Sequence, residues 1–175
     1  MLQTRLFGKT SQRCIHSSAV VNRLRSEWRR DRPPANVKLG AENVTVERKA
    51  YGGGKKAKAI TVCDGVYTLN SKNIEHTMKI MDVVYSEAGS HYTNEKIINK
   101  GAVLAVEGLQ LISDLDPLSL LSPDSSQELR NKFEQFTKDG QLLARVMTRP
   151  GQVGKCDGYI LEGHELDQTL GKIDQ

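Results

Sequence analysis

Short runs in which hydrophobic and polar residues alternate, separated by glycine, make up most of the chain after residue 43. Val44 and Val46 alternate with Thr45 and Glu47, which is the period-2 pattern of a strand with one buried face. A glycine triplet at 52–54 ends this run, and a second run follows it. Runs of this kind predict strands at 44–47, 56–62, 66–69, 78–85, 93–98, 101–107, 142–147 and 158–161.

Short strands at close spacing with glycine turns between them are typical of a small β-barrel or sandwich. The pair Asp64-Gly65 predicts one of the tight turns, since this dipeptide favours a hairpin. We therefore predict a mainly β fold: a small barrel of about six to eight short strands, with an extended basic N-terminal arm and one or two short helices.

One stretch, residues 127–138, has helical spacing instead, because Leu129, Phe133 and Phe136 recur every three or four residues and so share one face. It lies in a segment at about 113–140 that begins acidic and rich in serine and proline. We interpret this segment as an acidic and helical insertion in the barrel. A turn at 162–166 leads into a second, C-terminal helix or coil.

The N-terminal part of the chain is basic and lacks the strand pattern. No acidic residue precedes Glu27, and serine and threonine are frequent, a composition typical of a mitochondrial presequence. We predict a presequence at 1–21, cleaved near Ile15 by resemblance to matrix-processing sites; a basic RNA-binding or disordered tail is the alternative. Pro33 and Pro34 forbid a continuing helix, so residues 22–43 are expected to be an extended basic arm and residues 44–175 the barrel domain.

The distribution of charge points to a polyanionic partner. Residues 1–58 hold 14 Lys or Arg and 4 Asp or Glu, whereas residues 59–175 hold 11 and 17. The net charge of +4 therefore hides a first part at +10 and a second part at −6. A basic segment attached to an acidic body usually binds a polyanion.

Membrane insertion and a disulfide framework are not expected. The longest apolar run, residues 102–106, is far shorter than the roughly 20 residues of a membrane-spanning helix. Cys14, Cys63 and Cys156 are widely spaced and odd in number, without the CxxC pairs of a zinc or redox site. We expect reduced thiols and no membrane partner.

No catalytic pattern emerges from the sequence. The histidines at 16, 76, 91 and 164 lack the spacing of metal ligands such as HExxH, and the GxSxG motif of a serine nucleophile is missing. Gly151 to Cys156 also fails as a P-loop, because its glycine spacing is wrong and no Ser or Thr follows the lysine. We predict no enzyme, no catalytic residue, no cofactor, no metal and no small-molecule substrate.

Two glycine-rich segments are instead flanked by cations, at 52–58 and at 148–155. Glycine lets a backbone approach a phosphate closely, and Lys or Arg supplies the charge. Taken singly, each segment also fits a hairpin turn with solvated lysines. Together with the basic arm they favour phosphate contact. With only 9 aromatic residues, stacking of single-stranded bases is less favoured than recognition of folded RNA.

Two longer motifs resemble a known family. The run RPPANVKLG at 32–40 is similar to RPxANTKIG, and RPGQVGKCDGYILEGHEL at 149–166 is similar to RPGQCGRADGYVLEGKEL, both of the S8e family of archaeal and eukaryotic small-subunit ribosomal proteins. Residues 51–59 resemble that family's VRGGNKKYRAL, residues 80–85 its RIIDVVYN, and residues 101–106 stand at its NCIVLID. The resemblance covers roughly residues 30–173, in the same order.

This resemblance implies a β-barrel with basic extensions and a structural role in the small ribosomal subunit, with ribosomal RNA and neighbouring ribosomal proteins as partners. A ribosome-assembly factor with the same domain is the alternative function, since a large-subunit assembly factor shares the fold. An enzyme or small-molecule binder on this fold is a third reading, which no motif supports. The residues expected to contact ribosomal RNA are Arg29, Arg30, Arg32, Asn36, Lys38, Lys55, Lys56, Lys58, Arg149, Gln152 and Lys155.

The sequence also departs from the family. Its very basic N-terminus with the segment TGGKRK is replaced here by the presequence-like stretch, and QTLG at 168–171 stands where the family has the aromatic and basic EFYLRK. Phosphate contact should therefore be sparser than in cytosolic relatives. We predict a mitochondrial version of the family, located in the matrix.

Overall fold

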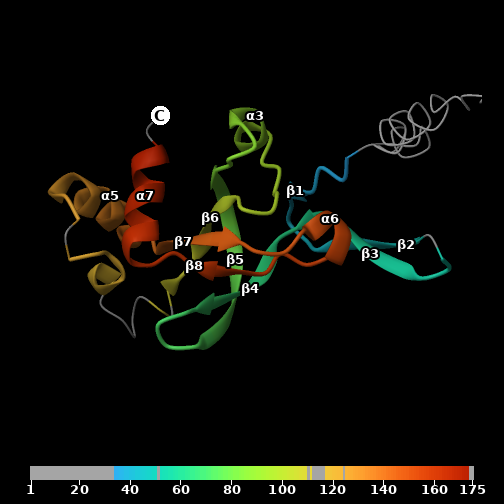
Figure 1. Ribbon diagram of the computed structural model, residues 1–175, viewed down its shortest axis with the longest axis horizontal. Coiled ribbons are helices and arrows are strands. Elements are labelled where there is room, and N and C mark those ends of the chain that lie inside the picture. Colours follow the sequence, from blue (N-terminus) through green and yellow to red (C-terminus); the bar gives the residue numbers. More distant parts are fainter. Residues whose placement is uncertain (1–33, 51, 110, 112–116, 124, 174–175) are drawn as a thin grey trace, which may run out of the picture. The chain divides into compact units, whose positions relative to one another are not determined.

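A closed five-stranded barrel forms the centre of the molecule (Figure 1). The computed structural model describes residues 34–50, 52–109, 111, 117–123 and 125–173, and one compact unit begins at Ala35. Neighbouring barrel strands are antiparallel, except that the last closes onto the first in parallel, Tyr67 opposite Gly158. In barrel order the strands are β4 (Asp64–Leu69), β5 (Ile74–Tyr85), β6 (Val103–Glu107), β7 (Gln141–Val146) and β8 (Gly158–Ile160).

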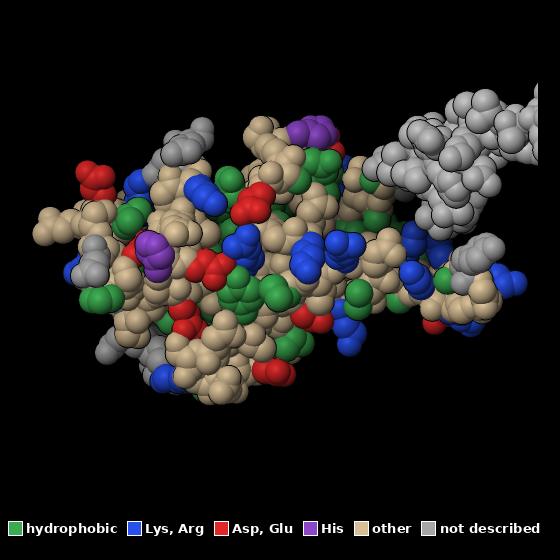
Figure 2. All heavy atoms as spheres, viewed as in Figure 1, with side chains coloured by type: hydrophobic (Ala, Val, Ile, Leu, Met, Phe, Trp, Pro, Cys, Tyr) green, Lys and Arg blue, Asp and Glu red, His purple; other side chains and the backbone are tan. Residues whose placement is uncertain are grey.

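Three further strands form a separate sheet beside the barrel. Its order is β1 (Lys38–Leu39), β3 (Lys55–Val62) and β2 (Val44–Lys49). The last two form an antiparallel hairpin, here called the ribbon, which extends away from the barrel. Every residue of β2 is exposed, and the same ribbon stands in solvent in the space-filling view (Figure 2).

Four helices and one 3-10 turn occur among the described residues. In Figure 1, α5 and α7 lie on one side of the barrel, where α5 contacts both α7 and β7, and the ribbon lies on the other side. None of these helices is long and apolar enough to span a membrane. Their bounds are α3 (Ser90–Asn94), η1 (Pro117–Leu120), α5 (Gln127–Lys138), α6 (Pro150–Val153) and α7 (Gly163–Ile173).

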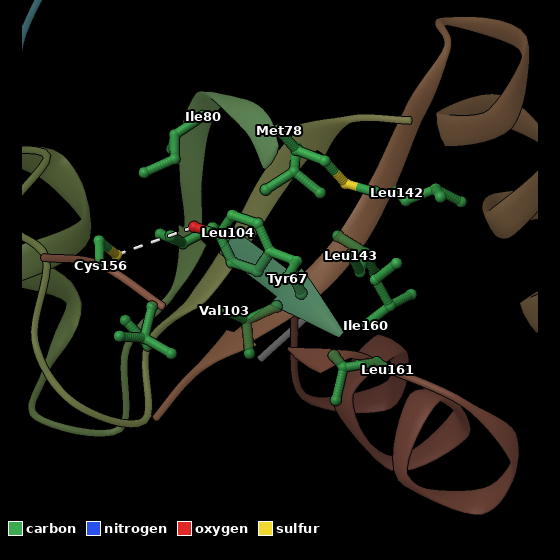
Figure 3. Packing of buried hydrophobic residues seen from close by; sticks show 14 of the residues in the cluster. Tyr67, Met78, Ile80, Val103, Leu104, Leu142, Leu143, Cys156, Ile160 and Leu161 are labelled. Carbon is green, nitrogen blue, oxygen red and sulfur yellow. Dashed lines mark hydrogen bonds between the residues drawn. The ribbon is translucent and has the colours of Figure 1, made fainter. Parts of the chain in front are cut away.

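The hydrophobic core fills the barrel (Figure 3). It also includes buried residues of α5 and α7. Strand β4 shows how the alternation works: Tyr67 and Leu69 are at most 1% exposed, whereas Val66 between them is 37% exposed. Strand β6 is buried at four consecutive positions, so both of its faces are covered. Each large apolar side chain buried in this way contributes about 1.5–3 kcal/mol to folding.

The pair Asp64-Gly65 does not form the predicted turn; it begins strand β4. A Cβ on Gly65 would lie 1.8 Å from the carbonyl oxygen of Cys156. The glycine therefore allows two backbone segments of the barrel to lie close together. The Asp-Gly dipeptide alone does not distinguish this role from a tight turn.

The predicted strand at 93–98 is also wrong. Residues 90–94 form the short helix α3, and the backbone after it pairs with the segment that contains β1. The Ile98 N–H donates to the Val37 carbonyl at 2.8 Å, and the Leu39 N–H donates to the Lys96 carbonyl at 3.0 Å. Ile97 and Ile98 are both 1% exposed, so consecutive residues are buried here and no strand alternation exists.

The mainly β fold with a small barrel is confirmed, with two differences in detail. Only five strands close the barrel, because β1, β2 and β3 form their own sheet. The structure also has helices that were not predicted, α3 and α6, whose five and four residues are too few to show a helical period. The predicted helix at 127–138 is confirmed as α5.

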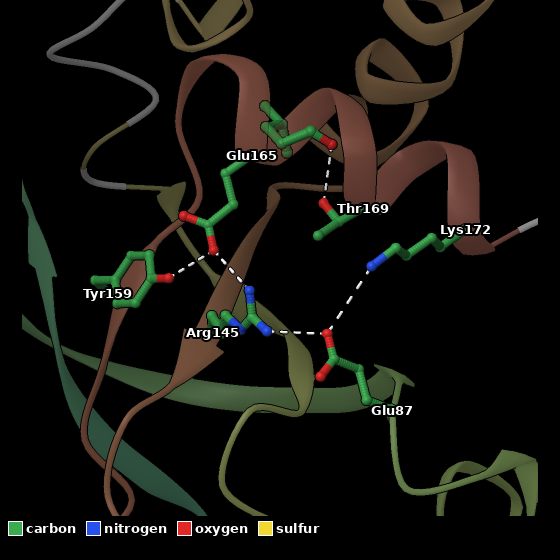
Figure 4. A network of polar contacts seen from close by, with 7 residues as sticks. Glu87, Arg145, Tyr159, Glu165, Thr169 and Lys172 are labelled. Atoms are coloured by element: carbon green, nitrogen blue, oxygen red, sulfur yellow. Dashed lines mark hydrogen bonds and ion pairs between the residues drawn. The ribbon is translucent and has the colours of Figure 1, made fainter.

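Charged residues of the barrel are used to attach helix α7 (Figure 4). Arg145 of β7 donates to Glu165 at 2.8 Å and to Glu87 at 3.0 Å, and the Tyr159 hydroxyl donates to Glu165 at 2.6 Å. The bond with Glu165 raises the pKa of Arg145. Burial acts to raise the pKa of Glu165, but the bonds from Tyr159 and Arg145 outweigh it, and the net direction is downward.

Candidate nucleic-acid interface

The second glycine-rich segment folds as a single helical turn, α6, and packs against the end of the predicted arm. A Cβ on Gly151 would lie 2.3 Å from the Cβ of Ala35 and 3.6 Å from a methyl carbon of Val37. Val37 is 2% exposed, and β1 follows it directly. The last part of the predicted arm therefore belongs to the folded unit, and α6 holds it.

The ribbon approaches the same helical turn. A Cβ on Gly154 would lie 3.0 Å from the Cβ of Ala57 and 3.6 Å from the methyl group of Thr45. Only glycine, alanine and a short threonine meet at this contact, which allows the backbones to lie close together. The structure thus brings together three segments that are far apart in sequence: residues 35–39, the ribbon and residues 148–155.

Local hydrogen bonds fix the shape of the second glycine-rich segment. The Gly154 N–H donates to the Pro150 carbonyl at 2.9 Å, closing the helical turn, and Pro150 at its first position has a backbone already suited to a helix. The Thr148 hydroxyl donates to the Lys155 carbonyl at 2.9 Å, which joins the two ends of the segment. Arg149, Gln152 and Lys155 are exposed on this small closed loop.

The register of the ribbon divides its side chains between two faces. Residues directly opposite each other point to the same side of an antiparallel pair, and Arg48 lies opposite Lys56 while Val46 lies opposite Lys58. These four side chains, with Ile60, form what we call the open face. Val46 and Ile60 are 37% and 49% exposed, so this face combines three cations with accessible aliphatic groups.

The other side of the ribbon, called the packed face, carries α6. It contains the small residues Thr45 and Ala57 that meet Gly154. Nearer the turn it contains Lys55, whose ammonium group lies 3.2 Å from the carboxylate of Glu47. Lys49, opposite Lys55 in the register, adds a second cation beside this ion pair.

The described residues that were predicted to contact RNA are all accessible. Lys58 is half-buried, and the other seven are exposed. Two of them have acidic partners, since Lys38 lies 3.8 Å from Glu95 and Lys55 pairs with Glu47. Within the described part of the chain, no carboxylate lies within 4 Å of the cations at 56, 58, 149 and 155. Arg29, Arg30 and Arg32 lie outside the described residues.

Sequence reasoning missed Arg48 as a member of this surface. Arg48 lies close to the glycine-rich turn in the sequence, but only the pairing register of the two strands shows that it lies opposite Lys56. Like charges directly opposite each other on a sheet destabilise it by about 0.2–1 kcal/mol. Two such cationic pairs, Arg48 with Lys56 and Lys49 with Lys55, therefore favour a bound polyanion.

The charge of the molecule is concentrated around this site. Residues 35–62 and 148–157 together hold eight Lys or Arg and three Asp or Glu, whereas α5 and α7 together hold four of each. In Figure 2, blue side chains gather over the ribbon, while red and blue are mixed over the helices. A field of one sign over one surface attracts an anionic ligand and speeds its association.

The described residues also bear on metal and thiol chemistry. They contain no cluster of three His, Cys, Asp or Glu side chains suited to hold a metal ion. Cys156 is fully buried, and its sulfur lies 3.8 Å from the Tyr67 hydroxyl. Burial raises the pKa of the Cys156 thiol to about 11 and also raises the pKa of Tyr67, so both groups stay protonated and unreactive near neutral pH.

Comparison with known proteins gives consistent matches. Residues 9–161 match the family described as Ribosomal protein S8e. The small ribosomal subunit protein eS8 of Theileria annulata is 31% identical over 163 residues, covering 89% of this chain and 88% of that protein. The small ribosomal subunit protein eS8 of Caenorhabditis elegans is 30% identical over 175 residues, covering 81% and 83%.

Proposed function

Because this chain belongs to the ribosomal protein S8e family, we propose that it is a structural constituent of the mitochondrial small ribosomal subunit and binds ribosomal RNA through the basic surface around α6. Its relatives are named as proteins of the small ribosomal subunit, a structural role that agrees with the predicted lack of enzymatic activity. The chain covers most of their length, so the whole-protein role of these relatives is carried over.

The meeting of three basic segments at α6 is the observation that carries the RNA-binding part of the proposal. Residues 35–39, the ribbon and residues 148–155 present exposed cations around one helical turn. Among the described residues, Arg149 and Lys155 have no carboxylate within 4 Å. Such groups bind phosphates without first breaking an ion pair.

The proposed contacts differ in chemistry from residue to residue. Arg149 is suited to bidentate contact with a phosphate, and Lys155 to contact as a point charge. Gln152 and Asn36 offer amide donors to phosphate or ribose oxygens. The other expected contacts are Lys38 in β1, Lys55 on the packed face of the ribbon, Lys56 and Lys58 on its open face, and the arm residues Arg29, Arg30 and Arg32.

The mitochondrial part of the proposal is supported by the sequence of residues 1–21, which is free of acidic residues and includes Arg5, Lys9 and Arg13. The match to the family begins at residue 9, ahead of the proposed cleavage near Ile15. Cleavage there would remove only the first few matched residues, and every proposed RNA contact would remain in the mature protein.

Sedimentation of a mitochondrial lysate tests the proposal. We expect the protein to co-migrate with small ribosomal subunits, and its N-terminal sequence to begin close to residue 16. Migration with large-subunit precursors would instead support the assembly-factor alternative. Recovery only on cytosolic ribosomes, with Met1 or Leu2 as the first residue, would refute the mitochondrial part and leave the family role intact.

Filter binding tests the RNA part separately. The Arg149→Ala/Lys155→Ala variant should bind structured ribosomal RNA more weakly, with an unchanged unfolding temperature because both side chains are exposed. The slope of log K against log[salt] should become less steep by about 0.9 for each lost phosphate contact. An unchanged slope would mean that these two residues do not contact phosphate.

A further inference from the structure

We propose that the open face of the ribbon is a second RNA-binding surface, so that one copy of the protein holds two RNA helices at once. This inference rests on the proposed function, because it assumes that the surface around α6 binds RNA. It adds a binding surface and an architectural role, that of a bridge between two double-helical segments.

The two sets of cations lie on opposite sides of one sheet. Gly154 places α6 on the packed face, against Ala57 and Thr45, so the exposed residues of α6 stand on that side. Arg48, Lys56 and Lys58 alternate with the residues of the packed face and therefore point the other way. The sheet separates the two sets of cations. A stiff double helix bound on one side of the sheet cannot also contact the cations on the other side.

The open face has the features of a site for double-helical RNA. Its three cations come from both strands of the ribbon, and within the described residues none of them has a carboxylate partner. Val46 and Ile60 supply half-exposed aliphatic groups. None of the five residues that form this face is aromatic, so it lacks the aromatic platform on which single-stranded bases usually stack. The wide, shallow minor groove of A-form RNA is open to such a surface, with cations on the phosphates and aliphatic groups over the riboses.

An acidic protein is the competing occupant, and the observations favour it less. A protein interface has a fully buried apolar core with aromatic or other large anchors, whereas the open face offers only two aliphatic side chains beside three charges. The like-charge cross-strand pair on this face, Arg48 with Lys56, is also more easily explained by a polyanion with charges repeated along its length than by scattered carboxylates.

A bridging assay tests the inference with the full chain. Donor-labelled and acceptor-labelled RNA duplexes of about 20 base pairs, somewhat longer than a typical double-stranded RNA site, are mixed with the protein, and energy transfer between them is measured. The wild-type protein should give transfer, and two-duplex complexes should be visible by sedimentation. Raising the salt from 50 to 200 mM should weaken the open-face site about 40-fold, as expected for three phosphate contacts.

The decisive variant is Arg48→Gln/Lys56→Gln/Lys58→Gln. It should still bind one duplex through Arg149 and Lys155 beside α6, which the three substitutions leave in place, but lose energy transfer. The Arg149→Gln/Lys155→Gln variant should lose transfer in the same way, through the other surface. The matched control is Lys72→Gln/Lys79→Gln/Lys100→Gln, which removes three exposed charges elsewhere and should bridge like wild type.

The outcomes separate this inference from the proposed function. If the wild-type protein binds one duplex tightly without transfer, or if the open-face variant bridges as well as wild type, the second surface is refuted while RNA binding stands. If the wild-type protein binds no RNA, the proposed function fails and the inference fails with it. An open-face variant that bridges normally but no longer binds an acidic ribosomal protein would assign the face to that protein. Unchanged thermal unfolding of every variant excludes misfolding as the cause.

Discussion

The barrel and the ribbon are both built from β-strands, but they use charged residues in opposite ways. In the barrel, Arg145 is about three-quarters buried and donates to two carboxylates, Glu165 and Glu87. In the ribbon, Arg48 is exposed and faces another cation, Lys56, across the strands. An arginine is therefore paired with carboxylates in the barrel, whereas in the ribbon an arginine lies opposite another cation.

This difference indicates where stability and binding reside. The barrel has a continuous apolar core beneath α5 and α7, whereas β2 has no buried residue at all. A two-stranded hairpin alone is at best marginally stable in water, so the ribbon depends on β1 and α6 for its position. We expect substitutions in the barrel to change folding first, and substitutions in the ribbon to change RNA affinity first.

The largest expected effect is in the barrel core. Val83 of β5 is 3% exposed and lies opposite Leu104 of β6, so Val83→Asp would bury a carboxylate without a partner. We expect a loss of at least about 3 kcal/mol in the free energy of unfolding, measured by urea denaturation. The control Ile74→Asp, at a position that is 39% exposed, should cost about 1 kcal/mol or less. Equal losses in the two variants would contradict the assignment of the core.

Substitution of Gly151 should produce a smaller effect that is confined to the ribbon side. In Gly151→Ala the new Cβ would lie 2.3 Å from the Ala35 Cβ, so α6 must move away from residues 35–37. We expect a cost of about 1–3 kcal/mol, with faster hydrogen exchange in β1 to β3, unchanged exchange in β5 and β6, and weaker RNA binding.

The matched control for that experiment is Gly171→Ala in α7. No described atom lies within 4 Å of the position a Cβ would take there, and alanine favours a helix over glycine by about 1 kcal/mol. This variant should be slightly more stable and bind RNA normally. Faster exchange throughout the barrel in Gly151→Ala would show that the two regions fold as one unit and would break the comparison.

The ion pairs that attach α7 should show in the pH dependence of stability. The pKa of Glu165 is lower in the folded protein than its usual 4.5, so its contribution is complete above that value and is lost as the pH falls through the lowered pKa. Because Glu165 is about one-third exposed, we expect only about 1 kcal/mol. Urea denaturation between pH 6 and pH 3 should show a steeper decline in wild type than in Glu165→Gln, and parallel curves would mean that this carboxylate does not stabilise the fold.

The barrel was more predictable from the sequence than the interface. The strands and α5 follow from side-chain periodicity, which is set by local burial, and they were placed within a few residues. Gly65 was misinterpreted because a glycine that admits a neighbouring backbone resembles a turn glycine, and the segment at 93–98 because Ile97 and Ile98 are buried by pairing with residues 37–39. Both errors come from contacts between residues distant in sequence.

The residue types of the interface were predictable, but their arrangement was not. Cations beside glycine indicated phosphate contact, and the structure places the described ones on accessible surfaces. Their division between two faces depends on the strand register and on the packing of α6 against Ala57, neither of which a local pattern contains. For the same reason Arg48 was missed, and the pairing of Lys55 with Glu47 was not foreseen.

The smallest expected effect has the opposite sign to the others and is the sharpest test of the comparison. Arg48→Gln removes one member of a like-charge pair on an exposed strand, so it should raise the free energy of unfolding by a few tenths of a kcal/mol, within the range of cross-strand pairs of about 0.2–1 kcal/mol. The gain should shrink in high salt because screening weakens the repulsion.

The corresponding change in the barrel, Arg145→Gln, should lower the free energy of unfolding by about 1–3 kcal/mol, since it leaves Glu165 and Glu87 without their shared donor. Denaturation of both variants at low and high salt measures the sign of each change in the free energy of unfolding. A lower stability of Arg48→Gln would mean that this arginine stabilises the fold, which would contradict its assignment to RNA binding.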